Sequence, residues 1–245
     1  MSGLWVLLAL ILISSLPMVA VFIWFRAAKY QFSIVRFLFA LLAGAAAFFP
    51  ALVMQDLLNL SIFTQGRMAL FYEFFIRVAF TEEFSRLLLL FVFFWINSLV
   101  KPAEGLDKPV TSNTIKKGTA TGLIAGLGFS ILESARYAAS NMSIGIALLR
   151  IFTAALHAAC GSRVGAAAVM FRTNPVQALL RLFTAVVIHG IYNFMVMVPG
   201  LWSIVAVLIA VLTLTTVILS IRDGWSSEEP AELDSGVTLD KIGQK

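Results

Sequence analysis

Apolar residues run through this chain in seven stretches of about twenty, and short polar segments separate them. A helix that crosses a membrane needs ~20 mostly apolar residues, at 1.5 Å per residue. The pattern therefore predicts an all-α polytopic membrane protein with about seven transmembrane helices. Their predicted bounds are Leu4–Phe25, Phe37–Leu58, Arg77–Val100, Gly118–Ala139, Arg150–Phe171, Leu179–Val198 and Leu201–Ile221.

The third stretch is longer than a membrane requires, because an amphipathic segment starting near Met68 precedes it. One helix from Met68 to Val100 would be ~50 Å long, against a hydrocarbon core of ~30 Å. Either this helix tilts strongly, or the part from Met68 to Ile76 lies along the membrane interface.

Composition agrees with a membrane protein. Apolar residues make up 60% of the chain and charged residues 13%, against roughly 25% charged residues in a soluble domain. We predict one transmembrane domain over residues 1–222 and a disordered, polar cytoplasmic tail over residues 223–245. The single Cys160 excludes an internal disulfide, and we expect no cleavable signal peptide.

Lysine and arginine residues gather in alternate loops, after the first, third, fifth and seventh predicted helices. Such loops favour the cytoplasmic side of a membrane, so we predict an external N-terminus and a cytoplasmic C-terminus. A nucleic-acid-binding protein would carry a basic stripe on a polar face, and we expect no nucleic-acid partner. The basic residues of these four loops are Arg26, Lys29, Arg36, Lys101, Lys108, Lys116, Lys117, Arg172, Arg181 and Arg222.

Four polar clusters interrupt the apolar stretches. An ionisable group at membrane depth costs about 2.5–3.5 kcal/mol on insertion scales, so a chain keeps such groups where they serve one another or a reaction. Three carboxylates, an arginine and two histidines suggest a hydrolytic site between helices. The clusters are Glu82, Glu83 and Arg86; Phe129, Glu133 and Tyr137; His157; and His189 with Asn193.

Two of the clusters also have a structural explanation when they are taken alone. Glu82 and Glu83 point about 100° apart on a helix. One of them can serve a reaction while the other pairs with Arg86, or both can belong to a charged patch at the interface. Glu133 shares one helical stripe with aromatic residues on either side, which suits a functional carboxyl group. The structural explanation is that Glu133 only forms an ion pair with Arg136, three residues further along the helix.

The histidines leave the same choice. A single histidine such as His157 is more often a hydrogen-bonded core residue than a metal ligand, and Cys160 beside it is best explained as a small apolar filler. His189 and Asn193 share a helical face, which suits either a ligand with its orienting partner or a polar contact between helices.

The depths of the clusters agree with one another. We therefore predict one polar layer in the outer half of the membrane. Gly122-x-x-x-Gly126 and Gly161-x-x-x-Gly165 would let two of the helices concerned pack closely. At 1.5 Å per residue, Glu83 lies ~9 Å below Arg77, Glu133 ~9 Å below Ala139, His157 ~10 Å below Arg150 and His189 ~13 Å below Val198.

In this order the motifs resemble those of the PrsW family of intramembrane proteases, which belongs to the wider group of CAAX prenyl proteases and bacteriocin-processing membrane proteins. The likeness runs from about Thr81 to Phe194. Arg86 stands where the family usually has lysine, which keeps the charge and changes the hydrogen-bond geometry. Glu133 stands where CAAX-type relatives more typically have histidine, which favours the PrsW branch. The segments that carry the likeness are EEFSR, GLGFSILESARY, RIFTAALHAACGSRVG and HGIYNF.

The resemblance implies a membrane-embedded peptidase of the bacterial cytoplasmic membrane. Its expected substrate is a membrane-anchored protein, similar to an anti-sigma factor, that is cut on the outer side. A base must activate water, and we assign Glu82 or Glu83 to this role, with Arg86 orienting a carboxylate.

The remaining residues would complete the site in one of two ways. His157, His189 and Glu133 would either hold a divalent metal, with zinc favoured by this set of ligands, or bind the scissile carbonyl directly without a metal. Asn193 would donate to the oxyanion or fix His189.

Two rival functions remain. A transporter or channel can also line its pathway with intramembrane glutamates and histidines. The absence of an inverted repeat and the single polar layer argue against it. An inactive homologue that binds transmembrane substrates is the other alternative, and the arginine at position 86 leaves it open.

Overall fold

The computed structural model describes residues 2–30, 32–59, 66–100, 110–140, 144–198 and 200–225. Within them every regular element is helical, which confirms the all-α class. The elements are α1 (Ser2–Ala27), α2 (Ile34–Leu57), α3 (Gly66–Phe71), the π-helix η1 (Tyr72–Phe80), α4 (Thr81–Val100), α5 (Ser112–Ser140), α6 (Ile144–Met170), α7 (Pro175–Met197) and α8 (Trp202–Trp225).

Three helical segments of the described residues are long and apolar enough to cross a membrane: Ile34–Leu57, Pro175–Met197 and Trp202–Arg222. Helices α5 and α6 are rich in glycine, alanine, serine and threonine. Such small residues suit a helix that packs closely against other helices. The number of seven crossing helices stays a prediction, and the predicted tail lies outside the described residues from position 226 on.

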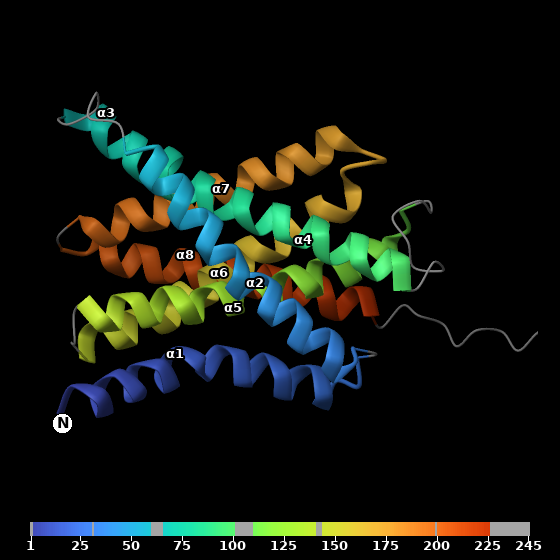
Figure 1. Ribbon diagram of the computed structural model, residues 1–245, viewed down its shortest axis with the longest axis horizontal. Helices are drawn as coiled ribbons and strands as arrows, with labels where there is room; N and C mark the ends of the chain where they lie inside the picture. The colour runs from blue at the N-terminus through green and yellow to red at the C-terminus, as the bar shows by residue number, and fades with distance from the viewer. Residues whose placement is uncertain are drawn as a thin grey trace, which may run out of the picture.

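The helices lie along one long axis, and their connections gather at its two ends (Figure 1). The α1–α2 and α6–α7 connections and the C-terminal end of α8 lie at one end. The N-terminus, α3 and the α7–α8 connection lie at the other. The segments at the first end carry Arg26, Lys29, Arg172 and Arg222. This arrangement agrees with the alternation of basic loops along the sequence.

Helix α5 is packed tightly between α2 and α6. A Cβ atom on Gly122 would lie 2.1 Å from the carbonyl oxygen of Gly161, and one on Gly161 would lie 2.4 Å from that of Gly122. On the α2 side, a Cβ on Gly44 would lie 1.8 Å from the carbonyl oxygen of Ala125. The close approach expected from the glycine spacing is therefore confirmed, and it brings the polar side chains of α5 against both neighbours.

The third helical run contains the π-helix η1, which joins α3 to α4 without a break. π-Helical turns are rare and occur frequently at functional sites. At the junction the hydroxyl of Thr81 donates to the carbonyl oxygens of Arg77 (2.7 Å) and Val78 (3.0 Å). The change of helical geometry thus ends directly before Glu82 and Glu83.

One predicted boundary is wrong in a way that affects the site. Helix α6 begins at Ile144, so Arg150 does not mark its outer end, and Arg150 is buried in an ion pair with Glu133. An arginine can lie inside a bundle when a carboxylate neutralises it. His157 consequently lies near the middle of α6, and its depth cannot be measured from Arg150.

Candidate active site

The first part of the site is a buried charge cluster around Arg86 of α4. Its guanidinium donates from Nη2 to Oε1 of Glu83 (2.7 Å) and from Nη1 to the carbonyl oxygen of His157 (3.4 Å). It also lies over the ring of Phe129 at 4.6 Å. Arg86 and Glu83 are both fully buried, so this single arginine connects α4 with α5 and α6.

Glu83 also holds the first of two histidines. Its carboxylate, ionised beside Arg86, can only accept a hydrogen bond. The Nδ1–H of His189, on α7, therefore donates to Oε1 of Glu83 at 2.7 Å. This contact fixes the tautomer and the orientation of the ring, as carboxylates do for metal-binding histidines. Nε2 of His189 is left to face Oε2 of Glu82, 3.8 Å away.

Glu133 and Arg150 hold the second histidine. Nε2 of His157 donates to Oε2 of Glu133 at 2.8 Å, and Nη2 of Arg150 donates to the same oxygen. Arg150 also donates to Oγ of Ser134 (2.9 Å) and lies over the ring of Tyr137 at 4.9 Å. The two histidines are therefore held in the same way. In each case a carboxylate that is neutralised by an arginine binds one ring nitrogen of the imidazole.

The two imidazoles meet edge to face, with ring centroids 5.0 Å apart. Nδ1 of His157 is buried and has no hydrogen-bond partner, and the same is true of Oε2 of Glu82. Unpaired buried polar atoms are costly and call for a specific explanation. Among the described residues, Oε2 of Glu83 and Oγ of Ser130 also lack a hydrogen-bond partner. The carboxylate of Glu82 accepts a hydrogen bond at Oε1 from Nε2 of Gln55 (3.2 Å), and its Oε2 lies 3.7 Å from Nη2 of Arg86.

A small cavity lies beside Glu82, between α2, η1, α4 and α5. Its volume is about 50 Å³, which is room for a few waters. Glu82 and Glu133 supply its carboxylates, and Gln55 and aromatic side chains complete it. The lining residues are Phe48, Ala51, Leu52, Gln55, Val78, Glu82, Phe129, Glu133, Arg136 and Tyr137. The bundle therefore has room for water beside Glu82.

A family model described as PrsW family intramembrane metalloprotease matches residues 33–219 of the chain. The chain belongs to the PrsW family. No curated protein and no solved structure matches it. The match includes every helix that contributes a side chain to the site. As a PrsW-family member, the protein is an integral membrane protein and an intramembrane protease.

The side chains of this PrsW-family site fit a divalent metal. Glu82, His157 and His189 each offer one ligand atom, and these atoms lie within 4.8 Å of one another. Two histidines with one carboxylate form a common catalytic zinc set. The donor set differs from the predicted one, because Glu82 replaces Glu133. Oε2 of Glu133 instead accepts hydrogen bonds from Arg150 and from Nε2 of His157.

Most of the predicted residues converge in the structure. Arg86 lies closer to Glu83 than to Glu82, since its Nη2 is 2.7 Å from Oε1 of Glu83 and 3.7 Å from Oε2 of Glu82; which of the two glutamates serves a reaction stays a prediction. Glu133 pairs with Arg150 of α6, an ion pair between helices that the sequence analysis did not predict. Asn193 is half-buried on α7, and the structure describes no hydrogen bond between it and the site.

Three contributing residues were missed by sequence reasoning. Arg150 and Ser134 complete the contacts of Glu133, and Gln55 binds Glu82. Gln55 carried a usable signal, because a primary amide within an apolar helix needs a polar partner. The sequence signal of Arg150 was misleading, because an arginine beside an apolar stretch usually indicates where a helix leaves the membrane, and not a residue inside the bundle.

Proposed function

We propose that this protein hydrolyses a membrane-anchored protein at a site formed by Glu82, His157 and His189. The observation that carries the proposal is the meeting of unpaired, buried atoms of Glu82 and His157 with the edge of His189, beside a cavity with room for water. Such unsatisfied groups are typical of a place where water or a substrate is bound.

In this proposal Glu82 is the acting carboxylate. It is the glutamate of the pair that lines the cavity, and its Oε2 has no hydrogen-bond partner among the described residues. Gln55 holds its other oxygen and so directs the free one towards the imidazoles. Glu83 and Arg86 do not contact the cavity, and they position His189 and the backbone of His157 instead.

The free ring nitrogens of the imidazoles carry lone pairs, because the other nitrogen of each ring donates to a carboxylate, so they would hold a metal ion or accept a hydrogen bond from the attacking water. Each has one ring nitrogen fixed by a carboxylate, so the other is oriented before a substrate arrives. Preoriented groups stabilise developing charge without reorganisation during the reaction. When a divalent metal such as zinc is bound, Glu82, His157 and His189 would hold it, and it would polarise water or the carbonyl.

We expect the purified protein to contain about one divalent metal ion per chain, because three buried ligand atoms converge. Elemental analysis of the detergent-solubilised protein measures this directly. Glu82→Gln and His157→Ala should lower the metal content several-fold, and Glu73→Gln should leave it unchanged. Fully active protein without metal would show instead that Glu82 acts as a base on its own.

The orientation proposed is an external N-terminus with the cavity towards the outer side. Cys160 is buried, so the native chain should not react with a membrane-impermeant maleimide. We expect Leu201→Cys, in the α7–α8 connection, to be labelled in intact cells. Thr173→Cys, in the α6–α7 connection, should be labelled only after permeabilisation. The reverse pattern would invert the topology.

The proposed function is tested by comparing protein termini in membranes of cells that express the wild type or Glu82→Gln at equal levels. Fragments that need Glu82 identify the substrate and its cut site together. Identical sets of termini in the two strains would contradict the proposal, provided that both proteins are present in the membrane.

A further inference from the structure

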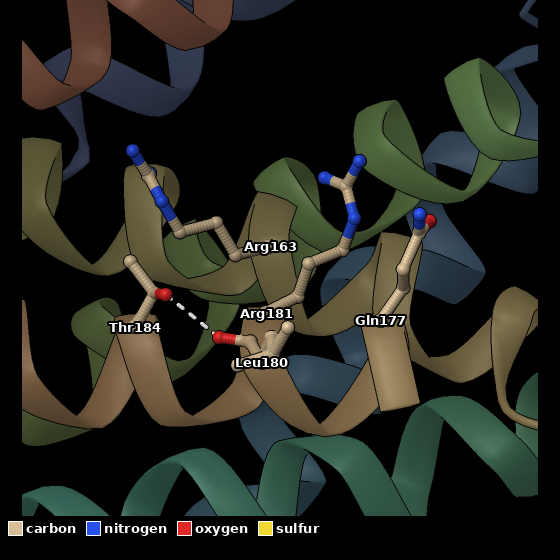
Figure 2. A pocket seen from close by; sticks show the side chains of 5 residues that line it. All are labelled: Arg163, Gln177, Leu180, Arg181 and Thr184. Carbon is tan, nitrogen blue, oxygen red and sulfur yellow. Dashed lines mark hydrogen bonds between the residues drawn. The ribbon is translucent and has the colours of Figure 1, made fainter. Parts of the chain in front are cut away.

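A second polar pocket lies away from the active site, between α6 and α7. It has a volume of about 380 Å³ and is lined by Arg163, Gln177, Leu180, Arg181 and Thr184. Figure 2 shows the guanidinium groups of Arg163 and Arg181 and the amide of Gln177 projecting to the same side of the pocket. Two cations from two helices thus border one open space.

The pocket lies near the basic end of the bundle. At 1.5 Å per residue, Arg163 is ~10 Å from the end of α6 at Met170, and Arg181 is ~9 Å from the start of α7 at Pro175. The connection between the two helices lies at the same end as the α1–α2 connection (Figure 1). In the proposed orientation this is the cytoplasmic leaflet.

Neither arginine has a carboxylate partner among the described residues. Nη1 of Arg163 donates to the carbonyl oxygen of Ala159 in its own helix (2.9 Å), and Arg181 forms no ion pair there. A guanidinium has five donors, so most of the donors in the pocket are unused. Two like charges within a membrane-spanning bundle are unfavourable unless an anion or water compensates them.

The face of α7 beside the pocket is apolar and exposed. Leu179, Leu180 and Phe183 are 52%, 58% and 64% exposed. On a membrane-spanning helix such a surface contacts acyl chains. The combination of paired guanidinium groups with an adjoining apolar face suits a ligand that has an anionic head and a hydrocarbon body.

We propose that Arg163 and Arg181 bind the phosphate of an anionic phospholipid of the cytoplasmic leaflet, with its acyl chains against α7. Basic pockets between transmembrane helices on this side bind such head groups, and arginine binds phosphate oxygens through two parallel hydrogen bonds. Gln177 adds a neutral donor at the same opening. This site is independent of the proposed proteolysis, because it shares no residue with the active site.

Two other anions fit the same charge. Free phosphate offers the same oxygens without a hydrocarbon body. The sequence also has an acidic segment after α8, with Glu228, Glu229, Glu232 and Asp234. The exposed apolar face favours the lipid, and the experiment separates the three.

The test is the thermal stability of the full-length protein in nanodiscs of phosphatidylcholine, with and without phosphatidylglycerol. At a tenfold excess of lipid over Kd, we expect the anionic lipid to raise Tm by roughly 3–6 °C. Arg163→Gln with Arg181→Gln should remove this rise. Arg26→Gln with Lys29→Gln removes the same charge from the same end of the bundle and should keep it.

A rise that persists in the double Arg163/Arg181 variant, or that is lost equally in the Arg26/Lys29 control, would overturn the proposal. So would an equal rise with inorganic phosphate alone. A rise that appears only after the four tail acids are changed to amides would assign the pocket to the tail. Should the double variant fail to fold, Arg181→Gln alone tests the same point, since Arg181 has no ion-pair partner to lose in the described structure.

Discussion

Glu82→Gln is expected to lower the rate of substrate cleavage by roughly 10²–10⁴-fold, the range over which general acid–base groups contribute. The amide cannot accept a proton from water, and it is a weaker ligand for a cation than a carboxylate. The variant should fold normally, because its remaining oxygen can still accept from Nε2 of Gln55. The measurement is the initial rate on the substrate identified from membrane fragments.

Two other glutamates serve as comparisons. Glu73→Gln changes a part-exposed carboxylate on the same helical run, outside the site, and should keep the wild-type rate. Glu83→Gln should reduce the rate less than Glu82→Gln does, because it disturbs the orientation of His189 and leaves the acting carboxylate in place. Full activity in Glu82→Gln with none in Glu83→Gln would reverse these assignments.

Arg86→Leu is expected to destabilise the fold itself, by about 3–5 kcal/mol. The substitution would leave Glu83 fully buried without its cation, and it would remove the hydrogen bond to the carbonyl oxygen of His157. The free energy of unfolding, measured by denaturant titration in mixed micelles, should fall accordingly, whatever the effect on catalysis.

A double substitution separates charge from packing. Glu83→Gln combined with Arg86→Leu removes both charges, so it should recover part of the stability lost in Arg86→Leu alone. Arg86→Lys keeps the cation and should be milder, although lysine cannot reproduce the contacts of the planar guanidinium with Glu83, His157 and Phe129. Wild-type stability in Arg86→Leu would show that the buried pair is not structural.

The sequence predicts the helical class and the residues that meet, for identifiable physical reasons. Apolar stretches define helices independently of their partners, and ionisable residues within them must find one another. The glycines at positions 122 and 161 likewise predict a close approach of α5 and α6, which the structure contains.

The roles of the individual glutamates depend on how each helix is rotated about its own axis, and the hydrophobic pattern does not specify this rotation. Glu82 and Glu83 lie on adjacent positions, and their facing depends on how α4 is rotated after the π-helix η1. Gln55 becomes visible as a partner only when α2 is placed against α4. Arg150 neutralises Glu133 from a separate helix, which leaves Glu82 and not Glu133 to complete the donor set.

Proteolysis in water enriched in ¹⁸O, by the purified protein in nanodiscs with its substrate, shows whether Glu82 takes part in adding water to the cleaved bond. If Glu82, His157 and His189 form one hydrolytic site, the new C-terminal carboxylate of the fragment will carry ¹⁸O with the wild type and with Glu73→Gln. With Glu82→Gln the labelled fragment will form roughly 10²–10⁴-fold more slowly. Labelled fragments at the wild-type rate from Glu82→Gln would show that Glu82 has no part in the hydrolysis.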